Sequence, residues 1–119
     1  MALDIGLSTA AVTIASGTSL SGSLAIGALV PVGLWMPAAW TPANITVQAS
    51  PDGGETFLEF VDSAGNAITV TVAAGQLVAF SEVMWQSVNF LKLRSGTLAS
   101  PVAQSADRII NLVLRDFVR

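Results

Sequence analysis

The chain has 119 residues, of which 52% are apolar and only 11% are charged, and its net charge is −3 with five basic residues. This length suits one hydrophobic core, and so few basic residues argue against a nucleic-acid partner. Cysteine and histidine are absent, which excludes disulfides, thiolate nucleophiles, Ser-His-Asp catalysis and the usual transition-metal ligands. We therefore expect one domain over residues 1–119, without a cofactor.

The beginning of the chain carries neither a secretory signal nor a membrane anchor that we can recognise. No positive charge precedes the first apolar residues, so we expect no signal peptide. The apolar stretch Leu24–Trp40 contains Pro31 and Pro37 and has no flanking lysine or arginine, which favours buried strands over a membrane helix. We expect residues 1–22 to form either an N-terminal arm or an edge strand.

Short apolar runs separated by Gly, Pro, Asn and Asp predict β-strands along the whole chain. The predicted strands cover residues 11–15, 20–26, 28–36, 44–50, 56–61, 67–72, 88–95 and 108–115. Pro31 inside the third run predicts an edge position or a bulge. Residues 51–54 (PDGG) and 62–66 (DSAGN) are typical of tight turns, so they predict hairpins on either side of residues 56–61.

Alternation of apolar and polar residues predicts which side chains face the core. In residues 108–115 the core face carries Ile110, Leu112 and Leu114, whereas residues 88–95 have one face that is apolar at its start and basic at its end, with Lys92 and Arg94. No segment keeps a helical apolar stripe behind a cap, and residues 81–87 allow one short turn at most. The pattern predicts an all-β fold, an antiparallel β-sandwich or jelly roll of about eight or nine short strands.

Paired carboxylates are the remaining option for catalysis, and acidic loops are the remaining option for a metal. Glu55 with Glu59, or Asp52 with Asp62, would have to meet across a cleft, but their positions near turns favour solvated carboxylates, so we expect no enzymatic activity. Calcium would find oxygen ligands in Asp52, Glu55, Asp62 and Asn66. Turn formation explains the same residues, and we expect no bound metal.

Tryptophan and arginine are the best candidates for contacts with a partner. Trp35, Trp40, Trp85 and Arg94 are the residues that we assign to an interface or a ligand contact, because exposed tryptophan anchors subunit contacts or stacks on sugar rings. Packing in the core is the alternative for each tryptophan. We expect Trp40 to be the most exposed, since it lies in a connection with two prolines, residues 36–42.

Four segments of the chain resemble small β-sandwich proteins encoded among the virion genes of tailed bacteriophages. They are residues 32–41 (VGLWMPAAWT), 45–54 (ITVQASPDGG), 91–97 (LKLRSGT) and 110–115 (INLVLR), and the resemblance covers most of the chain beyond Ser16. The middle and end also resemble a discoidin-like jelly roll, in the Ser-x-Asp-Gly turn and the later Leu-x-Leu-Arg strand.

The resemblance implies a virion structural protein that decorates or cements the capsid, made in the host cytoplasm. It implies a homo-oligomer, with a trimer as the expected form, bound to other virion proteins such as the major capsid protein. The low content of charge agrees, because such proteins hide surface between subunits. The alternative is a carbohydrate-binding jelly-roll module for adhesion to a host surface, in which Trp40 or Trp85 and Arg94 contact a glycan.

Overall fold

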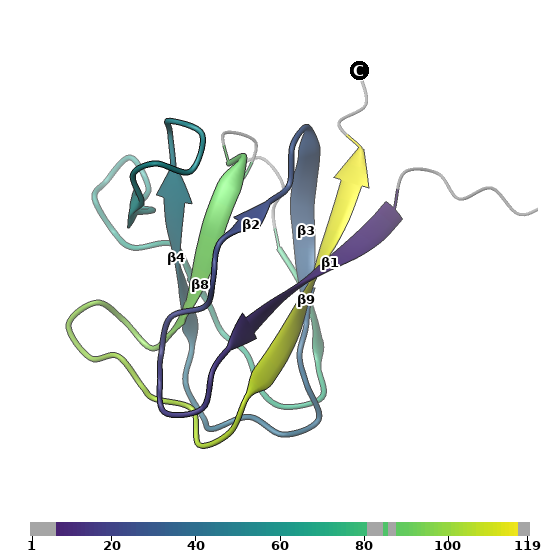
Figure 1. Cartoon of the computed structure of the whole chain (residues 1–119), viewed down its shortest axis with the longest axis vertical. Coiled ribbons are helices and arrows are strands. Elements are labelled where there is room, and N and C mark those ends of the chain that lie inside the picture. Colours follow the sequence, from purple (N-terminus) through teal and green to yellow (C-terminus); the bar gives the residue numbers. More distant parts are fainter. Residues whose placement is uncertain (1–6, 81–84, 86–87, 117–119) are drawn as a thin grey trace, which may run out of the picture.

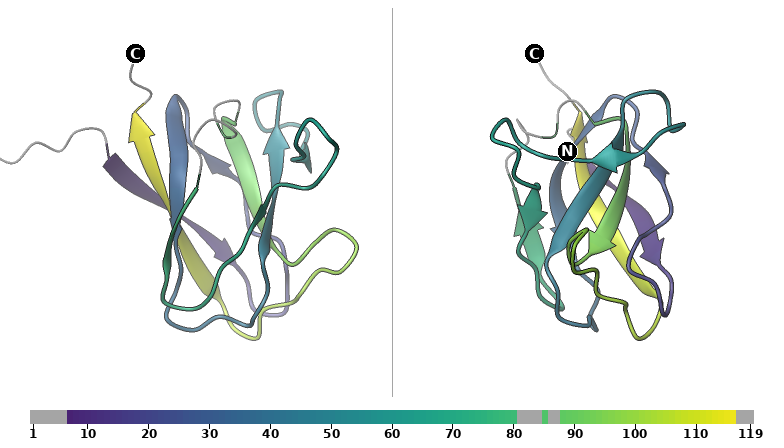
Figure 2. Two further views of the ribbon diagram at one scale, coloured as in Figure 1. Left: turned by 180° about the vertical axis from the view of Figure 1, so that it is seen from behind. Right: turned by 90° about the vertical axis from the view of Figure 1, so that its left-hand side faces the viewer.

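The computed structural model describes residues 7–80, 85 and 88–116. In these residues nine strands form two antiparallel sheets that lie face to face (Figure 1), and no α-helix occurs among them. The views from behind and from the side show the same two layers (Figure 2). The expected all-β sandwich is confirmed.

The first sheet has four strands in the order β1-β9-β3-β7, all antiparallel. Its strands are β1 (Leu7–Ile14), β9 (Arg108–Asp116), β3 (Leu29–Trp35) and β7 (Leu77–Ala79). The two ends of the described chain therefore lie side by side, and β1 is an edge strand. Residues 1–6, the rest of the arm considered above, are outside the described residues.

The second sheet has five strands, in the order β2-β8-β4-β5 with β6 also paired to β4. Its strands are β2 (Leu24–Ala25), β8 (Phe90–Ser95), β4 (Ile45–Ser50), β5 (Leu58–Glu59) and β6 (Thr69–Val70). β5 pairs with residues 48–49 and β6 with residues 45–46. Two short strands thus cover successive halves of one side of β4.

Both predicted turns around β5 are confirmed. β4 and β5 pair antiparallel, with Gln48 opposite Glu59. In the second turn the N–H of Asp62 donates to the carbonyl of Asn66 at 2.8 Å, and Gly65 adopts a φ of 85°. A positive φ is open to glycine at little cost, which explains why the reversal falls at this residue.

The core lies between the sheets and is mainly aliphatic, with two buried tryptophans, Trp40 and Trp85. In β9 the side chains of Ile110, Leu112 and Leu114 are buried, as the alternation predicted. They meet buried residues of β4, β6 and β8, among them Ile45, Val47, Val70, Leu91 and Leu93. Burial of one such side chain contributes about 1.5–3 kcal/mol, so this double layer supplies the main stabilisation of the fold.

Three of the predicted strands are shorter than expected, since residues 20–26, 56–61 and 67–72 contribute only β2, β5 and β6, of two residues each. Pro31 marks a bulge, as expected: the register of β3 against β9 shifts between Pro31 and Gly33. β3 itself lies inside the sheet, between β9 and β7, although β7 pairs with it only from Gly33 onward. β7 was missed in the sequence because it has three residues and too little alternation. The expected turn at residues 81–87 falls outside the described residues apart from Trp85.

The apolar stretch Leu24–Trp40 contributes β2 and β3, as the two prolines indicated. Among the residues that the structure describes, no helix has the length and apolar character needed to cross a membrane.

Candidate functional site: an apolar sheet face

The outward surface of the four-stranded sheet is the most prominent candidate for a site. Antiparallel partners share a face, and the register sets Val113 beside Thr9 and Gly33, and Trp35 beside Leu77. Since Ile110, Leu112 and Leu114 face the core, the odd-numbered residues of β9 face outward. We call the resulting surface the outer apolar face; its large side chains are those of Leu7, Trp35, Leu77, Ile109 and Val113.

Most of these side chains are unusually exposed for their size. Trp35 retains 54% of its accessible surface, Leu77 71%, Ile109 54% and Leu7 48%. A shallow groove of about 420 Å³ is lined by Leu7, Ser8, Thr9, Trp35, Leu77 and Val113. A contiguous exposed apolar patch on a small protein is typical of a site for protein contacts.

The outer apolar face is almost free of charge. Of the outward-facing residues in β1, β3, β7 and β9, Arg115 is the one ionic side chain in the described part of these strands, and it lies opposite Leu7 near the end of the sheet. The polar groups next to Trp35 and Val113 are the neutral side chains of Asn111 and Thr9. Such a surface can be desolvated without burying a charge.

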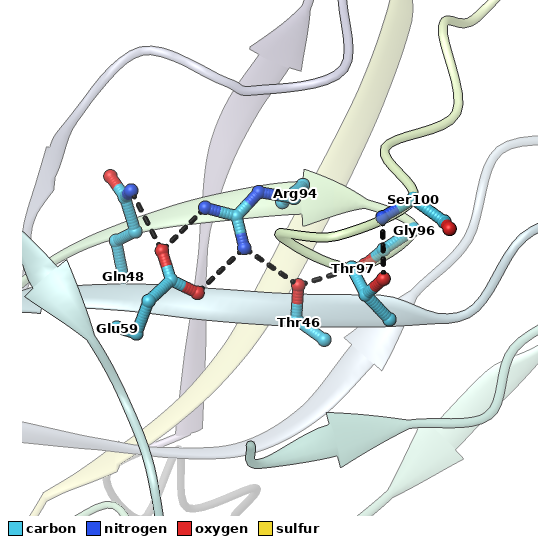
Figure 3. Close-up of polar contacts among 7 residues, drawn as sticks. All are labelled: Thr46, Gln48, Glu59, Arg94, Gly96, Thr97 and Ser100. Carbon is cyan, nitrogen blue, oxygen red and sulfur yellow. Dashed lines mark hydrogen bonds and ion pairs between the residues drawn. The ribbon is translucent and has the colours of Figure 1, made fainter.

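The outward surface of the second sheet is organised differently, around an ion pair (Figure 3). Arg94 on β8 and Glu59 on β5 form two parallel hydrogen bonds, from Nη1 to Oε1 at 2.7 Å and from Nη2 to Oε2 at 2.5 Å. The side chain of Arg94 is 5% exposed and that of Glu59 is 26% exposed. This fork geometry is the strongest arrangement available to an arginine and a carboxylate.

Two side chains of β4 complete the network around this pair. Thr46 Oγ1 accepts a hydrogen bond from Arg94 Nη1 at 3.2 Å and donates one to the carbonyl of Gly96. Gln48 Nε2 donates to Glu59 Oε2 at 3.0 Å. The hydrogen bonds from Arg94 lower the pKa of Glu59, and the bond to Glu59 raises the pKa of Arg94, so both groups stay charged at neutral pH.

The ion pair limits what these residues do chemically. A general acid of the glycosidase type requires a carboxyl group with a raised pKa, whereas the pKa of Glu59 is lowered. The expectation that Glu59 is a solvated carboxylate near a turn is wrong, because Arg94 reaches it across β4. Nor does Arg94 offer its guanidinium to a ligand in this structure, since Glu59 and Thr46 bind it.

The expectation that Trp40 is the most exposed tryptophan is wrong. Its ring is 8% exposed and its Nε1 donates to the carbonyl of Ala43 at 3.0 Å. The buried amide of Gln104 accepts from the N–H of Thr41 and donates to its carbonyl, at 2.8 and 3.0 Å. These bonds hold the connection against the sandwich and turn the indole inward; no local signal reveals a partner 63 residues away.

Trp85 is also part of the core. It is 1% exposed and contacts two phenylalanine rings, stacked on Phe80 with centroids 4.5 Å apart and edge-to-face with Phe60 at 5.7 Å. Of the four residues assigned to contacts from the sequence, Trp35 is therefore the exposed one, and it lies on the outer apolar face.

The acidic loops use their carboxylates to hold turns. Asp52 Oδ1 accepts from the N–H of Thr56, which is the largest cause of its lowered pKa. Asp62 Oδ1 accepts from the N–H groups of Ala64 and Asn66 at 2.9 Å. Glu55 is exposed. No group of three or more acidic side chains within the described residues is placed to hold a metal ion.

Comparison of the chain with protein-family models, with curated proteins and with solved structures finds no match. The resemblance to virion proteins thus has no support from a matched relative.

Proposed function

We propose that this chain is a non-enzymatic structural protein that works by assembly, as a homo-oligomer that decorates or cements the capsid of a tailed bacteriophage. The outer apolar face is the observation that carries the proposal. Its exposed tryptophan and aliphatic side chains surround a groove and carry almost no charge, which is the composition of the centre of a protein interface.

Three further features support an assembly role. Charged residues make up 11% of the chain, under half of the roughly 25% of an average soluble domain. The outer apolar face needs no conformational change to be buried, because its side chains project from a regular sheet. Residues 32–41, one of the segments that resemble virion proteins, include Trp35, which lines the groove of this face. The partners we propose are copies of the chain and virion proteins such as the major capsid protein.

The mass of the protein in solution tests this proposal. We expect sedimentation or light scattering to give a multiple of 12.2 kDa and Trp35→Lys to shift the mass to that of the monomer, because a charge inside an interface is costly to desolvate. The matched control is Leu98→Lys, since Leu98 is 66% exposed but lies outside the outer apolar face. A monomeric wild-type chain that is also missing from purified particles would refute the proposal.

A carbohydrate-binding role remains the second candidate, and one observation favours it. Trp35 is exposed beside Asn111, so an indole for stacking on a sugar ring and an amide for its hydroxyl groups lie next to each other. The contacts expected at Trp40, Trp85 and Arg94 are buried. Binding on a glycan array that is lost in Trp35→Ala but kept in Leu98→Ala would favour this role over assembly.

A further inference from the structure

β1 stands out among the edge strands of the sandwich. β7, at the other edge of the same sheet, has three residues, and the edge strands β2, β5 and β6 of the second sheet have two each. β1 has eight residues, all paired with β9 on one side. None of the described strands is hydrogen-bonded to its other edge, and β1 lies at the front of the molecule in Figure 1.

β1 also lacks the devices with which proteins protect such edges. Natural edge strands are kept from pairing with other chains by charged residues, proline, bulges or short length. The sequence of β1, LSTAAVTI, contains no charge, no proline and no glycine. Its register against β9 runs without a shift from Leu7 opposite Arg115 to Ile14 opposite Arg108, whereas β3 in the same sheet has a bulge.

We propose that a second copy of the chain pairs with β1, antiparallel and about a two-fold axis, so that two four-stranded sheets join into one sheet of eight strands. The inference rests on the proposed self-assembly and specifies the contact that produces it. Strand addition at an open edge is a common mode of protein association. The backbone of β1 already has the extended conformation that such pairing requires.

The chemistry of β1 suits a copy of itself. A group close to a two-fold axis lies near its own equivalent in the second copy, so a charged side chain there would meet a like charge. The middle of β1 consists of Ala10 and Ala11, which are small and neutral. The nearest arginines of the sheet, Arg108 and Arg115, lie beside opposite ends of β1, as far from the axis as the strand allows.

The pairing would also join the outer apolar faces of the two copies. Opposite residues of an antiparallel pair point to the same face, and a two-fold axis perpendicular to the sheet keeps the two outer faces on one side. Leu7, Thr9 and Val113 then border the seam, and the grooves of both copies lie along one continuous surface. A single surface of this kind offers a second protein, such as a shell subunit, twice the apolar area of one chain.

Two variants that each introduce one lysine, at opposite edges of the same sheet, test the inference. Ala11 on β1 and Ala79 on β7 are both exposed, so Ala11→Lys and Ala79→Lys introduce the same change at opposite edges. We expect the wild type to sediment at twice 12.2 kDa or another even multiple of this mass. Ala11→Lys should lose the pairing, and Ala79→Lys should keep the mass of the wild type. Circular dichroism and thermal melting of each variant establish that it folds.

Single cysteines locate the axis independently, because the chain has no cysteine of its own. We expect oxidation to cross-link the full chain as a dimer in one of Thr9→Cys, Ala10→Cys or Ala11→Cys, since the residue on the axis lies opposite its own copy at disulfide distance. Ala79→Cys is the control and is expected to stay uncross-linked.

The outcomes separate this inference from the proposed function. An oligomer that survives Ala11→Lys but dissociates in Trp35→Lys, or a trimer, which has no two-fold axis, would overturn strand pairing at β1 and leave assembly through the outer apolar face intact. A wild-type chain that is monomeric at every concentration would overturn strand pairing, and its absence from purified particles as well would overturn the proposed function.

Discussion

The two sheets of this sandwich bury similar side chains inward but differ in what they present outward. The second sheet carries an ion pair, Arg94 with Glu59, that hydrogen-bonds to neighbouring strands. The first sheet carries exposed Trp35 and Leu77 around a groove, with neutral neighbours. The polar outward side chains of the second sheet stabilise the isolated fold through their hydrogen bonds, whereas the apolar outward side chains of the first sheet would gain stabilisation only when covered by a partner.

Removal of the carboxylate from the ion pair should give the largest effect on the stability of the isolated chain. Glu59→Gln leaves the guanidinium of Arg94 buried without a counter-charge, which costs about 3–5 kcal/mol for a fully buried pair. Glu59 is 26% exposed, so we expect about 2 kcal/mol after allowing for solvent screening. Urea unfolding measures this loss of unfolding free energy. Glu55→Gln, on an exposed neighbour, is the control and should change stability by less than about 0.5 kcal/mol.

A similar loss in both variants would mean that the network in Figure 3 does not stabilise the fold. A double-mutant cycle with Arg94→Met isolates the pair, because the coupling energy cancels effects that either substitution has elsewhere.

The interior of the first sheet should be sensitive to backbone crowding. A Cβ at Gly33 would lie 2.8 Å from the carbonyl oxygen of Val78, and backbone cannot move aside as a side chain does. We expect Gly33→Ala to cost about 1–3 kcal/mol, the usual cost of overpacking, in thermal unfolding. Gly22→Ala, where a Cβ meets nothing within 4 Å, should be close to neutral. Equal stability of the two variants would contradict the close pairing of β3 and β7.

Acid should remove the stabilisation that the ion pair between Glu59 and Arg94 gives to the folded chain. The pKa of Glu59 in the folded chain is below its ordinary value of 4.5 because Arg94 donates hydrogen bonds to it. A lowered folded pKa means that the stabilisation is complete above the pKa of the unfolded chain and is lost as the pH falls through the folded value. We expect the stability difference between wild type and Glu59→Gln to shrink below about pH 4.5, measured by urea unfolding. A difference that stays constant down to pH 3 would contradict this assignment.

Substitution on the outer apolar face should have the smallest effect on the folding of one chain. Trp35 keeps 54% of its surface exposed, so we expect Trp35→Ser to change the unfolding free energy of the monomer by no more than about 1 kcal/mol. Its effect on association should be far larger. Urea unfolding at a concentration where the chain is monomeric measures the first quantity, and a loss above about 3 kcal/mol would show that the indole belongs to the core.

The sequence predicted the fold better than it predicted the surfaces. The spacing of Ile110, Leu112 and Leu114 in β9 and the glycine-containing turns around β5 depend on local chemistry, so these core residues and both hairpins lie where they were expected. Burial of Trp40 depends on Gln104, and the state of Glu59 depends on Arg94, which is 35 residues away. Contacts of this kind leave no periodic signal. The outer apolar face was hidden for the same reason, since it combines β1, β3, β7 and β9.

The uneven distribution of the three tryptophans gives the protein a built-in optical probe. Tyrosine is absent, and Trp40 and Trp85 are 8% and 1% exposed, against 54% for Trp35. Acrylamide or iodide added to the solution therefore quenches emission from essentially one indole. If that indole is covered when particles or oligomers form, its accessibility to quencher will report occupancy of the groove at concentrations too low for sedimentation, without any label.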